Sequence, residues 1–146
     1  MNLPFVSRQV LDSAELQIQN LNQEYQNYRR RTESARETSY QSGRNDAARQ
    51  FFPVYDNLLR ALQQPCQDEA YVKGIEMTLK SLRGVLSGLG LTEIPALGET
   101  FDPAVHEALE HITDSSVGEN TITSVALTGF RQGETVLRHA LVIVAN

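Results

Sequence analysis

An apolar stripe near the N-terminus constrains the fold of this chain more than any other feature of its sequence. The members recur with alternating spacings of three and four residues: Leu11, Ala14, Ile18, Leu21, Tyr25, Tyr28, Thr32 and Ala35. This is the heptad pattern of a coiled coil, in which each helix buries a narrow seam against a partner helix. No second stretch of equal length and pattern occurs in the 146 residues, so the seam predicts a homodimer.

The heptad pattern ends after Ala35. The same register places polar residues at the next four seam positions, which are Ser39, Ser42, Asp46 and Arg49. Gly43 lies among them and costs a helix about 1 kcal/mol relative to alanine. We therefore expect a weakly held or kinked stretch over residues 39–49, and we expect the long paired helices to melt before the rest of the chain.

Two shorter amphipathic helices are predicted next. The segment FFPVYDNLLRAL, residues 51–62, carries a proline suited to a first helical turn, and the helix should end near Pro65. The second helix should run from Asp68, a good N-cap, to Gly88 or Gly90. Such a pair buries little alone, so we expect a four-helix bundle in the dimer. The interface residues expected there are Leu58, Leu62, Gly74, Leu79 and Leu82. Gly74, inside the helix, either permits close backbone approach or is a weak point in the helix.

The last third of the chain has the pattern of β strands. TITSVALTGF and ETVLRHALVIVAN alternate with period two and are rich in Val, Ile, Thr and Leu, and RQG between them suits a hairpin. The sequence thus predicts an α+β fold in three parts. These are a long coiled-coil helix in residues 1–50, a helix pair of the dimeric bundle in residues 51–90, and a small β-rich wing domain in residues 91–146.

The formal net charge of −5 does not favour nucleic-acid binding, which depends on neutralising many phosphates. A local basic run contains Glu33 and Glu37 at helical spacings from its arginines, which predicts a solvated, internally paired helix face. A protein-docking patch is the alternative. The arginines are Arg29, Arg30, Arg31 and Arg36.

The single cysteine, Cys66, excludes an internal disulfide and fits a reducing compartment, and no histidine near it in sequence supports a nucleophilic role. No apolar run approaches the roughly twenty residues of a membrane span, and the N-terminal MNLPFVSRQV lacks the pattern of an export signal. We expect a cytoplasmic protein with no membrane partner.

The stretch HEALEH, residues 106–111, has the composition of a zinc-hydrolase motif but not its spacing. That motif places two histidines at i and i+4, whereas His106 and His111 are at i and i+5, about 140° apart around a helix. His139 is the remaining histidine and lies in a strand-like segment. We expect no metal here, and a short surface helix whose Ala108, Leu109 and Ile112 face a core.

The C-terminal residues resemble the signature of the GrpE family, whose members are nucleotide exchange factors of DnaK-type chaperones. The first half of the resemblance consists of Phe101, Asp102, Pro103, His106, Ala108 and Leu109, and the second of Gly129, Phe130, Glu134, Leu137, Arg138, Ala140, Val142 and Val144. The segments YRRRTE, FFPVYDNLLRAL and GIEMTLKSL are also similar to family segments. The resemblance therefore covers the chain from about Gln26.

The resemblance implies a homodimeric co-chaperone with no catalytic residues, no cofactor and no metal, which acts in protein folding and the heat-stress response. Its wing would enter the nucleotide cleft of the chaperone ATPase domain and stabilise the open form, which promotes ADP release. The residues assigned to partner contact are Arg29, Gly129, Phe130, Arg138 and Val144. Arg138 would orient the wing or touch the partner, Gly129 would serve a turn or bulge, and Val144 would be presented to the partner or be buried.

The same resemblance implies that Pro103 starts the short helix, that Phe101 and Leu109 pack beneath the wing, and that His106 forms local hydrogen bonds. The chain departs from the family pattern at Thr38, Ser42 and Thr135, which leaves the exact contact set open. The rival hypothesis is a coiled-coil scaffold dimer whose β domain binds an unrelated partner.

Overall fold

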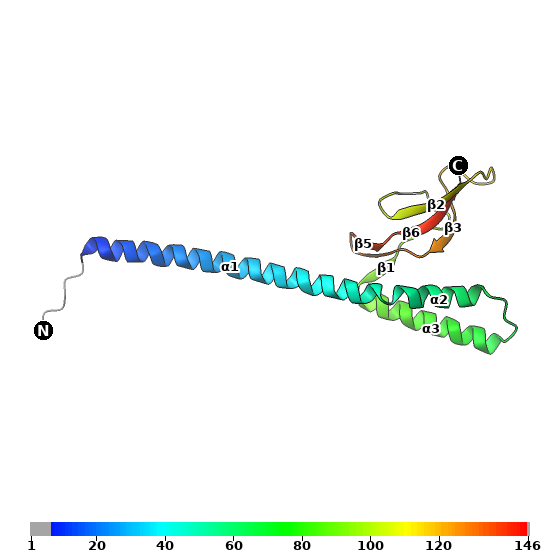
Figure 1. Ribbon diagram of the computed structural model, residues 1–146, viewed down its shortest axis with the longest axis horizontal. Coiled ribbons are helices and arrows are strands. Elements are labelled where there is room, and N and C mark those ends of the chain that lie inside the picture. The colour runs from blue at the N-terminus through cyan, green and yellow to red at the C-terminus, as the bar shows by residue number, and fades with distance from the viewer. Residues whose placement is uncertain (1–6, 146) are drawn as a thin grey trace. The chain divides into compact units, whose positions relative to one another are not determined.

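The computed structural model describes residues 7–145 (Figure 1). Residues 1–6 lie outside the described residues. They begin the predicted coiled-coil segment, and they belong to the N-terminal stretch that lacks an export pattern. The helices are α1 (Arg8–Arg49), α2 (Phe52–Gln63) and α3 (Glu69–Gly88). The strands are β1 (Leu91–Glu93), β2 (His106–Ile112), β3 (Ile122–Leu127), β4 (Phe130–Gln132), β5 (Thr135–Arg138) and β6 (Ala140–Ala145). The predicted α+β class is confirmed. The chain divides into one compact unit up to Gly43 and a second from Arg44 onwards.

The helix α1 is continuous over 42 residues, so the weakly held or kinked stretch predicted over residues 39–49 does not interrupt it. Polar seam residues remove a packing edge but leave the backbone hydrogen bonds of the helix intact, and one glycine weakens a helix without breaking it. The last turns are anchored in the second unit. Ala48 is fully buried, Arg44 Nη2 donates to the Leu89 carbonyl at 3.1 Å, and Arg49 Nε donates to the Leu137 carbonyl at 3.4 Å.

The helices α2 and α3 lie side by side (Figure 1) and begin with the predicted signals. A proline occupies the first turn of α2, where its missing N–H costs nothing. The Asp68 carboxylate caps α3 by accepting from the N–H groups of Ala70 at 3.0 Å and Tyr71 at 3.2 Å. The helices end at Gln63 and Gly88, as the sequence predicted.

The strands form two three-stranded sheets rather than one hairpin. The inner sheet, in the order β1-β4-β5, is antiparallel throughout. In the outer sheet, in the order β2-β6-β3, β2 is parallel and β3 antiparallel to β6. Each predicted long strand is therefore divided between the sheets, at residues 128–129 and at His139. The predicted hairpin turn does occur, between β4 and β5, where Gly133 has a φ of +55°.

The predicted short helix at HEALEH is wrong, because these residues form β2. Their helix propensity is overridden by the ladder with β6, which pairs His106 with Ala140 and Ile112 with Ala145. Pro103 lies in a turn and starts no helix. Phe101 packs against the outer core as predicted, whereas Leu109 is 59% exposed, so its predicted packing is wrong.

The two sheets have separate hydrophobic cores. The inner sheet shares one core with the helices, made by Ala48, Phe52, Tyr55, Leu79, Leu86, Leu91, Phe130 and Leu137. The outer sheet encloses its own, made by Ile94, Ala96, Ile122, Ala140, Val142 and Val144. The inner sheet and the helix pair are thus one packed body, and the outer sheet is a lobe attached to it.

Candidate interaction surfaces

The seam of α1 is exposed along its whole length. The exposed fractions are 53% for Leu11, 58% for Ile18, 66% for Leu21, 58% for Tyr25 and 57% for Tyr28, and Ala14 is exposed as well. Residues 7–40 contain no buried side chain. A helix that buries none of its apolar stripe gains nothing from tertiary packing, which supplies most helix stability in proteins. The stripe therefore presents an unpartnered apolar edge.

The basic run on α1 is not internally paired. All four arginines are exposed, and within residues 7–145 none of them has a carboxylate oxygen within ion-pair distance. The predicted pairing with Glu33 and Glu37 is therefore wrong in this structure. Arg29 belongs to this run, so its guanidinium is accessible to a partner.

The predicted bundle residues of α2 and α3 occupy different environments. Leu58, Leu62 and Leu82 are half-buried against the core that the helices share with the inner sheet. Leu79 is only 4% exposed and is a core residue of its own chain, so its side chain is not available to a second copy. Gly74 is exposed, and a Cβ built on it would meet no heavy atom within 4 Å. No element of the described chain approaches it closely.

Gly129 stands where the chain passes between the two sheets. The chain crosses from one sheet to the other after β1, between β3 and β4, and between β5 and β6, and we call these crossings passages. A Cβ on Gly129 would lie 2.5 Å from Ala140 N, 2.9 Å from Ala140 Cα and 2.9 Å from Ile94 Cδ1, and the Gly129 carbonyl accepts from Ile94 N–H at 2.9 Å. One residue from each passage meets at this point, and we call Ile94, Gly129 and Ala140 the neck. The glycine serves close backbone approach there.

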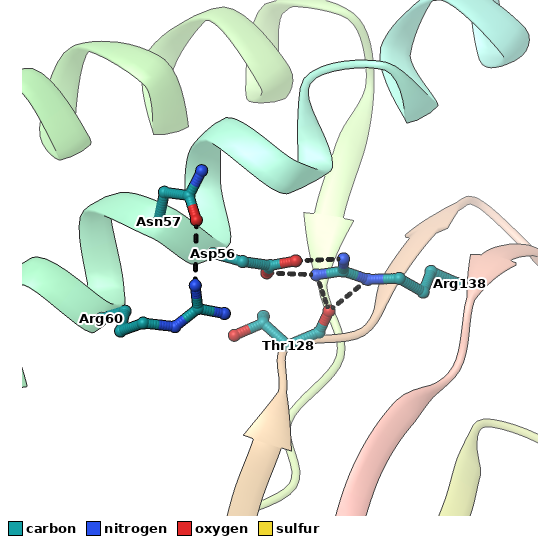
Figure 2. A network of polar contacts seen from close by, with 5 residues as sticks. All are labelled: Asp56, Asn57, Arg60, Thr128 and Arg138. Atoms are coloured by element: carbon teal, nitrogen blue, oxygen red, sulfur yellow. Dashed lines mark hydrogen bonds and ion pairs between the residues drawn. The ribbon is translucent and has the colours of Figure 1, made fainter.

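Arg138 binds α2 and the β3–β4 passage at once (Figure 2). Its Nη1 and Nη2 donate to the two Asp56 carboxylate oxygens at 2.7 and 2.8 Å. Its Nε and Nη2 donate to the Thr128 carbonyl at 2.9 and 2.6 Å. The guanidinium carbon also lies 4.9 Å from the ring centre of Phe52 and 5.5 Å from that of Phe130. The guanidinium is thus bonded within the chain, although 21% of the side chain remains exposed.

Phe130 and Val144 are core residues. Phe130 is 1% exposed, stacks on Phe52 with ring centres 4.5 Å apart and meets Tyr55 edge-on at 5.1 Å. Val144 is 0% exposed in the outer core, which is the buried alternative that the sequence left open. Contact of either side chain with a partner would require a core to open.

A second polar cluster joins α2, α3 and β1. The buried Tyr55 hydroxyl donates to Glu93 Oε1 at 2.7 Å and accepts from Arg83 Nη2 at 3.0 Å, and Arg83 Nε donates to Glu93 at 2.8 Å. Burial, followed by the bond to Glu93, raises the pKa of the Tyr55 phenol above its ordinary value. The bond to Tyr55 likewise raises the pKa of Arg83. The cluster therefore holds β1, the strand that leads to Ile94 of the neck, to both α2 and α3.

His106 is a structural residue in which both ring nitrogens are used. Nδ1 accepts from Asp102 N–H at 3.0 Å, so Nε2 carries the proton and donates to the Pro95 carbonyl at 2.9 Å. Asp102 in turn accepts from Ala104 N–H at 2.9 Å. The predicted local hydrogen bonding of His106 is confirmed, and no lone pair of this ring is left for a metal.

Residues 7–145 contain no group of three or more His, Cys, Asp or Glu side chains placed to hold a metal ion. Cys66 is exposed and its thiol contacts only the Asp68 carbonyl, at 3.8 Å. Among the helices in that range, none combines the length and apolar character needed to cross a bilayer.

Sequence reasoning missed Asp56 and Arg83, although a signal was present. Asp56 lies four residues after Phe52 and three before Leu59, and Arg83 lies four after Leu79 and three before Leu86. Each charge therefore occupies the apolar face of its helix, where it requires a partner. A charged residue at such a position predicts a contact with another element, although it does not say which one.

Comparison with known proteins identifies relatives over nearly the whole chain. A family model described as GrpE matches residues 7–146. Protein GrpE of Clostridium acetobutylicum is 41% identical over 136 residues, which cover 93% of this chain and 68% of the relative. Protein GrpE of Clostridium tetani is 40% identical over 123 residues, or 84% of this chain and 61% of the relative. Protein GrpE of Clostridium beijerinckii is 40% identical over 126 residues, or 86% and 60%. The chain thus spans 60 to 68% of the length of these relatives.

Proposed function

The chain belongs to the GrpE family, and from this premise we propose that it is a co-chaperone that promotes ADP release from the ATPase domain of a DnaK-type chaperone. The family match over residues 7–146 is the observation that carries the proposal. Nucleotide exchange breaks no covalent bond, so the proposal calls for no nucleophile, metal or cofactor.

The exchange mechanism is a linkage between two binding events. ADP contacts both lobes of a closed nucleotide cleft, so a protein that binds the open cleft better weakens ADP by the same factor by which ADP weakens that protein. A coupling free energy of about 3 kcal/mol would change the ADP affinity roughly 150-fold. The outer sheet is the part we assign to the cleft, because it is a lobe with its own core that projects from the helix pair.

We assign the exposed seam of α1 to pairing with a second copy of the chain. The stripe from Leu11 to Tyr28 is apolar, regular and uncovered, and pairing along such a seam is what a heptad pattern favours. Leu21→Asp places a charge on the most exposed leucine of the seam. We expect it to weaken the dimer, which raises the monomer fraction in analytical ultracentrifugation at micromolar concentration. A dimer that persists unchanged would contradict pairing along this seam.

The cytoplasm is the compartment we propose, with a role in protein folding under heat stress. Arg29, exposed on α1, is the helix residue we assign to chaperone contact. An Arg29→Gln variant should weaken binding to the chaperone ATPase domain, whereas Arg8→Gln, at the first residue of α1, is the matched control. Equal binding by both variants would remove Arg29 from the contact surface.

Stopped-flow release of a fluorescent ADP analogue tests the function directly. The chaperone is loaded with the analogue and mixed with excess ATP, with and without this chain. We expect release to accelerate with the concentration of the chain and to saturate. If the chain forms a dimer and binds the chaperone but leaves the release rate unchanged, the scaffold hypothesis explains it better.

A further inference from the structure

We propose that the ion pair between Asp56 and Arg138 is a latch that fixes the direction in which the outer sheet points from the helix pair. This inference rests on the proposed function, because the direction matters only if the outer sheet must enter a cleft in a partner. Asp56 and Arg138 are positioning residues, which act through the sheet they hold.

The latch controls two of the chain passages between the sheets. Arg138 is the last residue of β5, so its backbone leads directly into β6 of the outer sheet. The carbonyl that its guanidinium binds, at Thr128, lies in the passage from β3 to β4. Through the bonds to Asp56, both passages are held to one side chain of α2.

The geometry of the latch restricts angle as well as distance. A guanidinium presents its donors in a rigid plane, and a two-pronged bond to a carboxylate fixes the orientation of both groups. The side chains of Arg138 and Asp56 are only 21% and 14% exposed, so water competes little for these bonds. Ordinary surface ion pairs hold no such orientation.

Little else holds the outer sheet against α2. The inner and outer cores have no residue in common. A cavity of about 200 Å³ is lined on one side by Leu59, Arg60 and Gln63 of α2 and on the other by residues 125–128, with Asp56 at its edge. Because a cavity separates α2 from β3 there, the direction of the outer sheet depends on the neck, on Val136 of β5, which packs against the outer core, and on the latch.

A double-mutant cycle tests the proposal in the ADP-release assay. We compare Asp56→Asn, Arg138→Gln and the double variant, with Arg60→Gln as the control. Arg60 lies one turn away on α2 and donates to Asn57 Oδ1 rather than to Asp56 (Figure 2). If the latch raises the fraction of correctly directed molecules, its loss raises the concentration needed for half-maximal acceleration in proportion, by about tenfold if that fraction falls to a tenth. The maximal rate stays within twofold, because binding to the chaperone restores the direction.

Nonadditivity separates a latch from a direct contact. If Asp56 acts only through Arg138, Asp56→Asn has no further effect in a chain that already carries Arg138→Gln, so the double variant behaves like Arg138→Gln alone. Arg138→Lys, which keeps the charge but loses the two-pronged bond, should be intermediate. If Arg138→Gln impairs exchange strongly while Asp56→Asn behaves like Arg60→Gln, then Arg138 contacts the chaperone itself and the latch is refuted.

A distance measurement tests the latch without the chaperone. Spin labels are placed on Cys66, in the α2–α3 loop, and on Ser124→Cys, on an exposed position of β3, and labelled chains are diluted with unlabelled ones. We expect a narrow distance distribution in the parent chain and a broad one in Asp56→Asn, with the thermal melts of both showing folded protein. An unchanged distribution overturns the proposal. If the distribution broadens but the parent chain does not accelerate ADP release, the latch stands and the proposed function fails.

Discussion

Replacement of Gly129 by alanine tests whether the neck is as tightly packed as its distances indicate. The added methyl group would lie 2.5 Å from Ala140 N and 2.9 Å from Ala140 Cα, both of them backbone atoms of β6, and 2.9 Å from Ile94 Cδ1. Carbon atoms in contact prefer separations of about 3.5–4.0 Å. The isoleucine methyl can rotate away, but the β6 backbone can move only with its pairing to β2 and β3.

The cost follows from three contributions to the free energy of unfolding. Overpacking of a closed site costs about 1–3 kcal/mol, and the backbone neighbours place this site at the upper end. Displacement of β6 also strains the hydrogen bond from Ile94 N–H to the Gly129 carbonyl, 2.9 Å long, which contributes about 1 kcal/mol. The smaller entropy of an unfolded alanine returns about 0.4–1 kcal/mol. The net loss is about 3 kcal/mol.

Urea denaturation at a fixed protein concentration measures this loss, because the stability of a dimer depends on concentration. With a slope of about 1–3 kcal/mol per molar, the midpoint should fall by about 1–3 M. Gly84→Ala is the matched control, since a Cβ there meets nothing within 4 Å and the substitution should stabilise α3 by about 1 kcal/mol. If Gly129→Ala has the same midpoint as the parent chain, the neck is loosely packed and the reasoning is refuted.

Three further measurements test other parts of the structure. Because the pKa of Tyr55 is raised above 10.0, the unfolded chain loses this proton at lower pH than the folded chain, so the stabilisation is present below about pH 10 and is lost as pH rises towards the folded pKa. Urea midpoints from pH 9 to 11 should therefore fall more steeply in the parent chain than in Tyr55→Phe, and parallel slopes would contradict this. Gly74→Ala should stabilise the protein by about 1 kcal/mol if its surface is open, whereas a lower dimer affinity would show that a second copy approaches closely there. On heating, hydrogen exchange should protect residues 44–49 of α1 longer than residues 8–43, because Arg44 and Ala48 are anchored in the second unit, and uniform exchange along α1 would refute this.

The helical part of the fold could be predicted from the sequence because its signals are local. Pro53 and Asp68 act within one turn of their own helices, and the apolar spacing of α2 and α3 gives their lengths. The continuity of α1 through residues 39–49 has a cause that is not local. The polar residues after Ser42 look weak as a coiled-coil seam, but Arg44 and Arg49 bond to carbonyls 45 and 88 residues away.

The sequence predicted which segments of the C-terminal part are rich in β structure, but not how their strands pair and divide between two sheets. Residues 106–112 have helix formers, and only pairing with β6, far along the chain, makes them a strand. Likewise, alternation marked residues 121–130 and 134–146 as strands, but period two does not show that each segment divides at the neck. The sequence around Gly129 does not indicate this role, because a side chain is excluded there by Ala140 and Ile94, which are distant in sequence.

The charged residues Asp56 and Arg83 explain why the outer sheet is held at one angle to the helices and is not merely attached to them. Apolar burial is strong but non-directional, so the core shared by α2, α3 and the inner sheet would tolerate some rotation. Asp56 places a largely buried charge on the apolar face of α2, and its partner Arg138 lies in β5. Arg83 lies at the more exposed edge of α3 and pairs with Glu93 of β1. Because Tyr55 and Asp56 are consecutive on α2, the two clusters approach this helix from two strands and together define the angle at which the outer sheet leaves it.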